Sequence, residues 1–265
     1  MSVEVVDNGA VRRITLTRPE KRNAMTIEMF DAVTHAVEGA VADDAVRVVV
    51  IRGHGDHFCS GAEIGTGGPD RDEKPAKPRT GHLQRNLRAS PHRIVRTLFE
   101  AEIPIVTGVQ GYAAGIGTAL ALAGDHVVAT RSAQFWVPFV SRGFTPDSGT
   151  TYLLPRLIGV ARAKEMILRG KRVDGTLAAV WGLVSQVVDD DALDNAVEEV
   201  VQEFAHAPTV AVGLAKQLVF RAQTGDLNDA LEREALTEEL AVRSDDFKEG
   251  MRAFVQRRDP DYQGR

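Results

Sequence analysis

The stretch that most constrains the fold is residues 103–125, IPIVTGVQGYAAGIGTALALAGD, which holds five glycines and carries no charge before Asp125. It predicts a short buried strand over residues 103–109, a tight glycine turn over 110–117 and a small-residue helix over 118–123. Glycine at a strand-to-helix turn lets backbone N–H groups approach a ligand closely, and the first N–H groups of a helix favour negative charge. The turn therefore either stabilises an anion or is a close-packed turn in which glycine avoids a clash.

A membrane span is the competing interpretation of this stretch, because about 20 uncharged residues can cross a bilayer. Pro104 and Gln110 interrupt it, and few of its residues are strongly apolar. We therefore exclude a span and expect no membrane partner.

The composition is that of a globular enzyme-sized chain. The 265 residues, 43% hydrophobic and 26% charged, suit one large α/β domain or one domain with a small appendage. A net charge of −5 and 6% aromatic residues argue against a nucleic-acid surface. The lone cysteine, Cys59, excludes an internal disulfide, and residues 1–13 lack the organisation of a signal peptide. We expect a cytoplasmic protein.

Strands and helices are expected to alternate as far as about residue 190. Residues 3–7 and 11–17 flank Asn8-Gly9, which predicts a hairpin. Thr26 is a plausible N-cap for a helix over 27–41. The other expected elements are strands over 46–52, 127–130 and 184–188, an apolar extended segment over 133–139, a helix over 82–100 that Pro91 breaks or kinks, a glycine-containing turn over 141–158, and helices over 160–169 and 172–181.

Strands are not expected after residue 190. Four helices are predicted there, over residues 193–204, 210–223, 226–242 and 245–257. The predicted organisation is thus an α/β body, residues 1–190, followed by a helical region, residues 191–265.

A second glycine turn, GHGDHFCSGAEI over residues 53–64, also leaves a buried strand. Gly61-Ala62 here and Gly115-Ile116-Gly117 in the first stretch could each offer one backbone N–H to a single oxygen. Two such donors would form an oxyanion hole for a thioester enolate. The pair His54 and His57 has no further ligands nearby in sequence, so we expect no metal site.

Five segments together resemble the crotonase superfamily, the enoyl-CoA hydratase/isomerase family. They are LTRPEKRNAMT (16–26), HFCSGAEI (57–64), VQGYAAGIGTALALAGDHVVA (109–129), PDSGTTYLLPRLIG (146–159) and DFKEGMRAFVQRRDPDYQG (246–264). Each segment alone is modest evidence, but the five in the right order are specific. The resemblance implies a crotonase-like spiral of ββα units with a C-terminal helical trimerisation region, assembled as a homotrimer or a dimer of trimers.

The resemblance also implies an acyl-CoA substrate, with coenzyme A as part of the substrate and no other cofactor. The oxyanion donors would be the N–H groups of Ala62 and Ile116. Coenzyme A would lie along Ala62, Glu63 and Ile64 and near Lys21 and Arg22, where basic side chains could meet its phosphates. The alternative for Lys21 and Arg22 is ordinary solvated surface charge.

Two departures from the family pattern bear on the reaction. Hydratases of this family use two glutamates to activate and deliver water, and the matching positions here are Ala119 and Phe139. Neither side chain can transfer a proton.

One carboxylate, Asp147, stands at a position that isomerases of the family use. Burial among Trp136, Phe139 and Phe144 would suit it to remove and return a proton. The alternative is that Asp147 caps a helix beginning near Ser148. Glu63 is a weaker candidate, because the family carries an acidic residue there without using it chemically.

Three functions follow as hypotheses. The favoured one is isomerisation of an enoyl-CoA double bond by a single carboxylate, Asp147. The alternatives are an enoyl-CoA hydratase of low activity and a non-catalytic acyl-CoA-binding homologue. The sequence leaves the acyl chain open between fatty and aromatic.

Overall fold

The computed structural model describes residues 2–63 and 78–265, and its centre is a six-stranded sheet. The strand order is β1-β2-β3-β4-β6-β9, and only the β1–β2 hairpin is antiparallel. The strands of this sheet are β1 (Val3–Asn8), β2 (Val11–Leu16), β3 (Val48–Gly53), β4 (Ile105–Val109), β6 (His126–Thr130) and β9 (Gln186–Val188).

A second, three-stranded sheet sits beside the first. It consists of β5 (Tyr112–Ala114), β7 (Gln134–Trp136) and β8 (Val173–Asp174). β5 lies inside the segment expected to be only a glycine turn. It forms because its partner β7 pairs with it in parallel across twenty-odd residues of chain, a long-range contact that no local pattern reveals.

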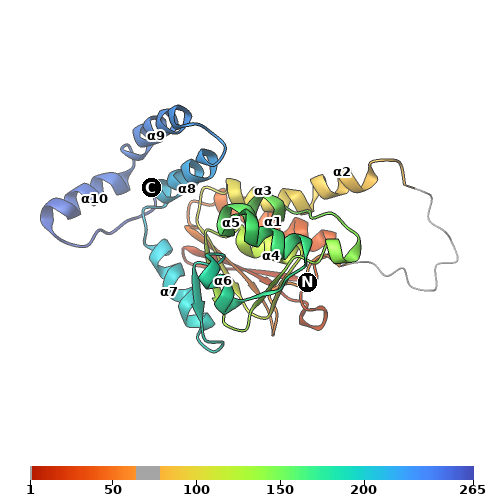
Figure 1. Ribbon diagram of the computed structural model, residues 1–265. Helices are drawn as coiled ribbons and strands as arrows, with labels where there is room; N and C mark the ends of the chain where they lie inside the picture. Colours follow the sequence, from red (N-terminus) through yellow and green to blue (C-terminus); the bar gives the residue numbers. More distant parts are fainter. Residues whose placement is uncertain (1, 64–77) are drawn as a thin grey trace.

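Helices cover both faces of the large sheet and extend beyond it (Figure 1). They are α1 (Ile27–Val41), α2 (His82–Ala89), α3 (Pro91–Glu100), α4 (Ile116–Leu122), α5 (Thr150–Leu168), α6 (Gly175–Trp181), α7 (Leu193–Ala205), α8 (Thr209–Ala222), α9 (Leu227–Ala241) and α10 (Asp245–Gln256), with short 3₁₀ turns η1 (Pro19–Lys21) and η2 (Val140–Arg142).

The core lies in two layers, one on each face of the large sheet. Side chains of α1, α3 and α4 pack with one face in the larger cluster, which includes Phe30, Leu98 and Leu120. The other face packs against α7, where Val197 and Val201 meet valines of the central strands. Since parallel strands are buried on both sides, β3 and β4 read as continuous apolar runs.

The amino-terminal elements agree with the expectation. Thr26 caps α1, because its hydroxyl accepts a hydrogen bond from the N–H of Met29 at 3.3 Å. The buried residues of α1 recur at helical spacing, so one face of the helix lies on the sheet.

Three expected elements differ in detail. The helix expected over residues 82–100 is two helices, α2 and α3, with Pro91 at the start of the second. The predicted turn over 141–158 contains the first half of α5, which continues to Leu168 across a kink at Gly159, where φ is +76°. The helix expected over 172–181 begins with the two residues of β8.

The last three helices form an arm, in which α8 packs against α3 while α9 and α10 lie apart from the sheet in Figure 1. The chain end returns to the body through Arg47, whose guanidinium donates to the carbonyls of Ala207 and Tyr262 and to the hydroxyl of Thr209, at 2.6, 3.0 and 3.0 Å. The domain boundary near residue 190 stays a prediction. Among the described residues, no helix combines the length and apolarity that a bilayer crossing requires.

Candidate active site

The two glycine turns lie side by side. The N–H of Cys59 donates to the carbonyl of Tyr112, and the N–H of Ala114 donates to the carbonyl of Cys59, both at 2.9 Å. A Cβ on Gly117 would lie 2.3 Å from the Cys59 carbonyl oxygen, so only glycine permits this approach. The glycine turn is therefore close-packed, as one of the two alternatives from the sequence predicted, and the packing brings the two turns together.

Ala62 and Ile116 present N–H groups that the surrounding backbone does not use. Ala62 forms a parallel bridge with Met25, in which Met25 donates to the carbonyl of Gly61 and accepts from Glu63. Ile116 is the first residue of α4, so its N–H has no intrahelical acceptor. Within the described residues neither N–H has an acceptor, and both residues line one cavity.

That cavity encloses about 330 Å³ and is mostly apolar. The two glycine turns form one wall, and η2 and the segment before α5 form another. Its apolar side chains come mainly from α2, α3 and the turn after β7, and they are Leu83, Leu87, Pro91, Ile116, Pro138, Phe139 and Phe144. Asp147 is the single carboxylate among the described residues that line it.

The Asp147 side chain does not cap α5. The N-cap of α5 is Gly149, and no side chain accepts a hydrogen bond from that helix end. The Asp147 carboxylate instead accepts a hydrogen bond from the hydroxyl of Ser148, 2.6 Å from Oδ1 to Oγ. The helix-cap alternative is therefore wrong, and Asp147 lines the cavity instead.

The expected aromatic setting of Asp147 is only partly found. Phe139 and Phe144 line the cavity, although Phe144 is 57% exposed, and Asp147 itself is half-buried. Trp136 is not brought to the cavity. Its indole N–H donates to the carbonyl of Gly170 at 3.0 Å, and its ring lies between the guanidinium groups of Arg142 and Arg172.

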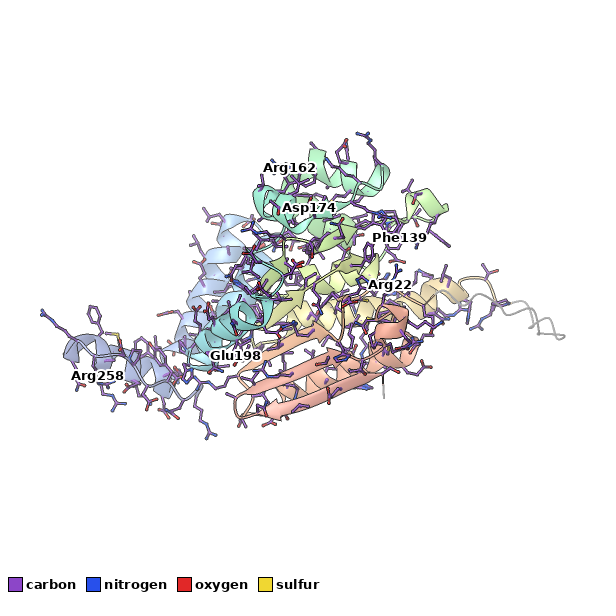
Figure 2. The ribbon with its side chains drawn as sticks, turned by 90° about the horizontal axis from the view of Figure 1, so that it is seen from below. Arg22, Phe139, Arg162, Asp174, Glu198 and Arg258 are labelled. Carbon is purple, nitrogen blue, oxygen red and sulfur yellow. The ribbon has the colours of Figure 1, made fainter. Side chains whose placement is uncertain are left out.

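The basic loop after β2 docks against the glycine turn of residues 53–64. The N–H of Ser60 donates to the carbonyl of Arg22, and the Ser60 hydroxyl to that of Lys21, at 3.0 and 3.3 Å. Both basic side chains are exposed, and Arg22 lies over the Tyr112 ring. Figure 2 shows Arg22 and Phe139 on the same side of the body, far from Arg258 on the arm.

Glu63 is engaged elsewhere. Arg18 binds its carboxylate at 3.0 Å, and this hydrogen bond lowers the pKa of Glu63. An ion-paired, exposed carboxylate is a poor proton acceptor, which agrees with its lower rank as a base. Ile64 lies outside the described residues.

Two supporting residues escaped sequence reasoning. Asn23 is fully buried, and its amide donates to the carbonyls of His54 and His57 at 3.0 and 2.7 Å. Ser148 is buried beside Asp147 with φ at +58°. No sequence pattern marks either residue, except that Asn23 follows Arg22 and Ser148 follows Asp147.

Comparison with known proteins decides the family. The enoyl-CoA hydratase/isomerase family model matches residues 7–265. The chain belongs to this family.

Relatives of both reaction types resemble the chain. The 1,2-epoxyphenylacetyl-CoA isomerase of Escherichia coli K12 is 36% identical over 260 residues, 98% of this chain and 97% of that protein. The 2,3-dehydroadipyl-CoA hydratase of the same strain is 32% identical, over 95% of this chain and 94% of that protein. The crystal structure of an enoyl-CoA hydratase from Bacillus anthracis covers 100% of both chains with a TM-score of 0.89 at 28% identity.

The crotonase-type fold expected from the sequence is thus confirmed. The structure shows where the two residues that replace the hydratase glutamates of this family lie. Ala119 is completely buried in α4, and Phe139 is part of the cavity wall. Neither contributes an ionisable group.

Proposed function

We propose that this protein is an isomerase that moves a carbon–carbon double bond in an enoyl-CoA thioester, with Asp147 as its acid–base group. One observation carries the proposal: among the described residues, Asp147 is the single carboxylate lining the cavity that the unused N–H groups of Ala62 and Ile116 border. A double-bond shift needs one base that removes a proton and returns it elsewhere. Hydration by the family's usual route needs two carboxylates.

The reaction would run through a thioester enolate. The Asp147 carboxylate takes a proton from C2 of a 3-enoyl-CoA, and the electron pair of that C–H bond moves onto the thioester oxygen. The N–H groups of Ala62 and Ile116 stabilise this oxyanion. The pair then returns to the carbon chain, Asp147 gives its proton to C4, and a 2-enoyl-CoA results. The step is redox-neutral and uses no cofactor beyond the coenzyme A of the substrate.

The cavity is suited to the acyl group. Leu83, Leu87 and Phe139 offer an apolar wall. The exposed Lys21 and Arg22 flank the turn of residues 53–64 from outside. Because the phosphates of coenzyme A are anionic, this basic loop supplies the complementary charge. The acyl group would therefore lie inward and the nucleotide outward.

The test is Asp147→Asn assayed on a panel of acyl-CoA thioesters with mass spectrometry. Isomerisation, seen as a product of unchanged mass, should fall by about a hundredfold or more, because the amide cannot accept a proton. Binding of the thioester should persist. Asp44→Asn, which changes an exposed aspartate elsewhere, is the matched control and should keep full activity.

The other outcomes separate the alternatives. Wild-type turnover in Asp147→Asn would refute Asp147 as the base. A product heavier by one water would mean hydration. Tight binding without turnover across the panel would mean an acyl-CoA-binding protein.

We also propose a homotrimeric assembly, alone or as a dimer of trimers. The arm leaves large apolar side chains uncovered on three successive helices. They are Val219, Leu227, Leu231, Leu236, Leu240, Met251, Phe254 and Val255, each at least half exposed. Large exposed apolar side chains repeated over three successive helices favour an interface, and copies of the same chain would cover them.

A further inference from the structure

Ser148 holds an unfavourable backbone conformation at the edge of the cavity. Its φ is +58°, in the left-handed region that L-residues other than glycine and asparagine rarely adopt. The residue is 2% exposed, so solvent does not relieve the strain. Strain of this kind persists only where surrounding contacts enforce it, and its presence at a site motivates a functional reading.

The strained conformation delivers a hydrogen bond to the proposed base. The Ser148 hydroxyl donates to Oδ1 of Asp147 at 2.6 Å, a short distance that fits a charge-assisted bond. Behind it, the N–H and hydroxyl of Thr150 donate to the Asp147 carbonyl at 3.3 and 3.0 Å. Asp147 is thus held at its backbone and at one carboxylate oxygen.

The second carboxylate oxygen is left available. Within the described residues no donor reaches Oδ2 of Asp147, and both Asp147 and Ser148 line the cavity that holds the oxyanion donors. The two oxygens are therefore inequivalent: Oδ1 is occupied by Ser148, and Oδ2 is free for a substrate.

We propose that Ser148 is a positioning residue, which fixes the Asp147 carboxylate so that Oδ2 alone carries the proton between the two substrate carbons. The inference rests on the proposed isomerase function. In the first step the C2–H bond breaks, an O–H bond forms at Oδ2, and the electron pair moves to the thioester oxygen. In the second step that O–H bond breaks and the proton passes to C4. The Ser148 proton stays on Ser148 throughout.

Loss of the Ser148 bond should release the carboxyl group to rotate about its Cβ–Cγ bond. A rotated carboxyl presents its proton to the open side of the cavity, because Asp147 is only half-buried. The proton then exchanges with solvent before it is returned. Internal transfer of the substrate's own hydrogen is therefore the property that Ser148 should protect.

The experiment uses the full chain, a 3-enoyl-CoA carrying deuterium at C2, and the variants Ser148→Ala, Ser148→Gly and Ser148→Cys. Removal of the hydroxyl should lower kcat about ten- to hundredfold, the effect of one hydrogen bond to a charged group, with KM nearly unchanged. The share of deuterium retained at C4 should fall in Ser148→Ala and Ser148→Gly. Ser148→Cys, a weaker donor of similar shape, should lie between these variants and the wild type.

Ser148→Gly separates positioning from folding. Glycine adopts a φ of +58° without strain, so its thermal midpoint should equal or exceed that of the wild type while kcat and deuterium retention fall. Wild-type kcat and retention in Ser148→Gly would overturn the inference. If Asp147→Asn is inactive in that case, the proposed function survives and only the role of Ser148 is lost; an active Asp147→Asn would remove both.

Discussion

At the residue scale, a histidine with a lowered pKa bonds the two turns of the proposed oxyanion site to each other. Nδ1 of His57 accepts a hydrogen bond from the N–H of Tyr112 at 3.2 Å, and the two rings lie 5.1 Å apart. Partial burial, and then the positive charge of Arg22, lower the pKa of His57 below its ordinary value of 6.5. Protonation would turn this acceptor into a donor and remove one of the hydrogen bonds that join the two glycine turns.

His57 should make stability depend on pH in a defined window. Because the folded-state pKa is lowered, the unfolded chain takes up the proton first as the pH falls. The contribution of neutral His57 is therefore complete above pH 6.5 and is lost below it. We expect the denaturant midpoint to decline between about pH 7 and about pH 5.

His57→Asn is the control for this prediction, since its amide oxygen can accept the Tyr112 N–H but cannot titrate. The difference in midpoint between wild type and variant should shrink as the pH falls, and equal pH slopes would contradict the assignment. An NMR titration of His57 gives the direct check.

The residue scale also shows where sequence reasoning stops. Ala62, Ile116 and Asp147 could be named from the sequence because the segments that hold them resemble the motifs of the family. The contact of Gly117 with the Cys59 carbonyl joins residues far apart in sequence, and only the parallel pairing of their segments creates it. The sequence predicts only a helix beginning near Ser148, since no sequence pattern indicates its positive φ.

At the scale of elements, local signals sufficed where a cap and an apolar stripe coincide, as in α1 with Thr26. They failed in α5, where Gly149, Pro155 and Gly159 all suggest a turn. Pro155 lies inside the first helical segment, where it cannot donate a backbone hydrogen bond, and Gly159 absorbs a kink, so two short helical segments join into one element. The outcome there was decided by packing of Leu153, Leu154 and Ile158 in the core.

A partly buried ion pair joins α8 to Asp125, which lies between α4 and β6 and bonds to the first residue of β4. Lys216 pairs with Asp125 at 2.7 Å and donates to the carbonyls of Leu98 and Ile103 at 2.9 and 3.2 Å, while Asp125 accepts from the N–H of Ile105. Burial lowers the pKa of Lys216 and raises that of Asp125, and the attraction within the pair opposes both shifts.

Lys216→Met should destabilise the fold by about 1–3 kcal/mol, because it takes the cation and its hydrogen bonds away from the partly exposed Asp125 carboxylate. The double variant Lys216→Met/Asp125→Asn should recover a large part of that loss. Chemical denaturation at one protein concentration measures both. Lys248→Met removes a lysine from an exposed pair with Asp245 and should cost about 1 kcal/mol or less. Equal losses in the buried and exposed single variants would contradict this account.

At the scale of the whole molecule, contacts within one chain leave the apolar side chains of the arm, α8, α9 and α10, exposed. α9 has no buried residue, yet Leu227, Leu231 and Leu240 stand on it more than half exposed. A helix with this composition gains little from facing water. In the proposed trimer, side chains from other copies of the chain would cover these leucines.

The assembly prediction is measured by sedimentation or light scattering. The wild-type chain, 28.7 kDa as a monomer, should run at three or six times that mass. Phe254→Glu and Leu231→Glu place a charge on the exposed apolar surface of the arm and should lower the assembled fraction, because burying an unpaired carboxylate is costly. Val180→Glu introduces the same charge at a 72% exposed valine on α6, outside the arm, and should leave the mass unchanged. A monomeric wild type at micromolar concentration would refute the trimer, and a loss of assembly in Val180→Glu alone would move the interface from the arm to the body.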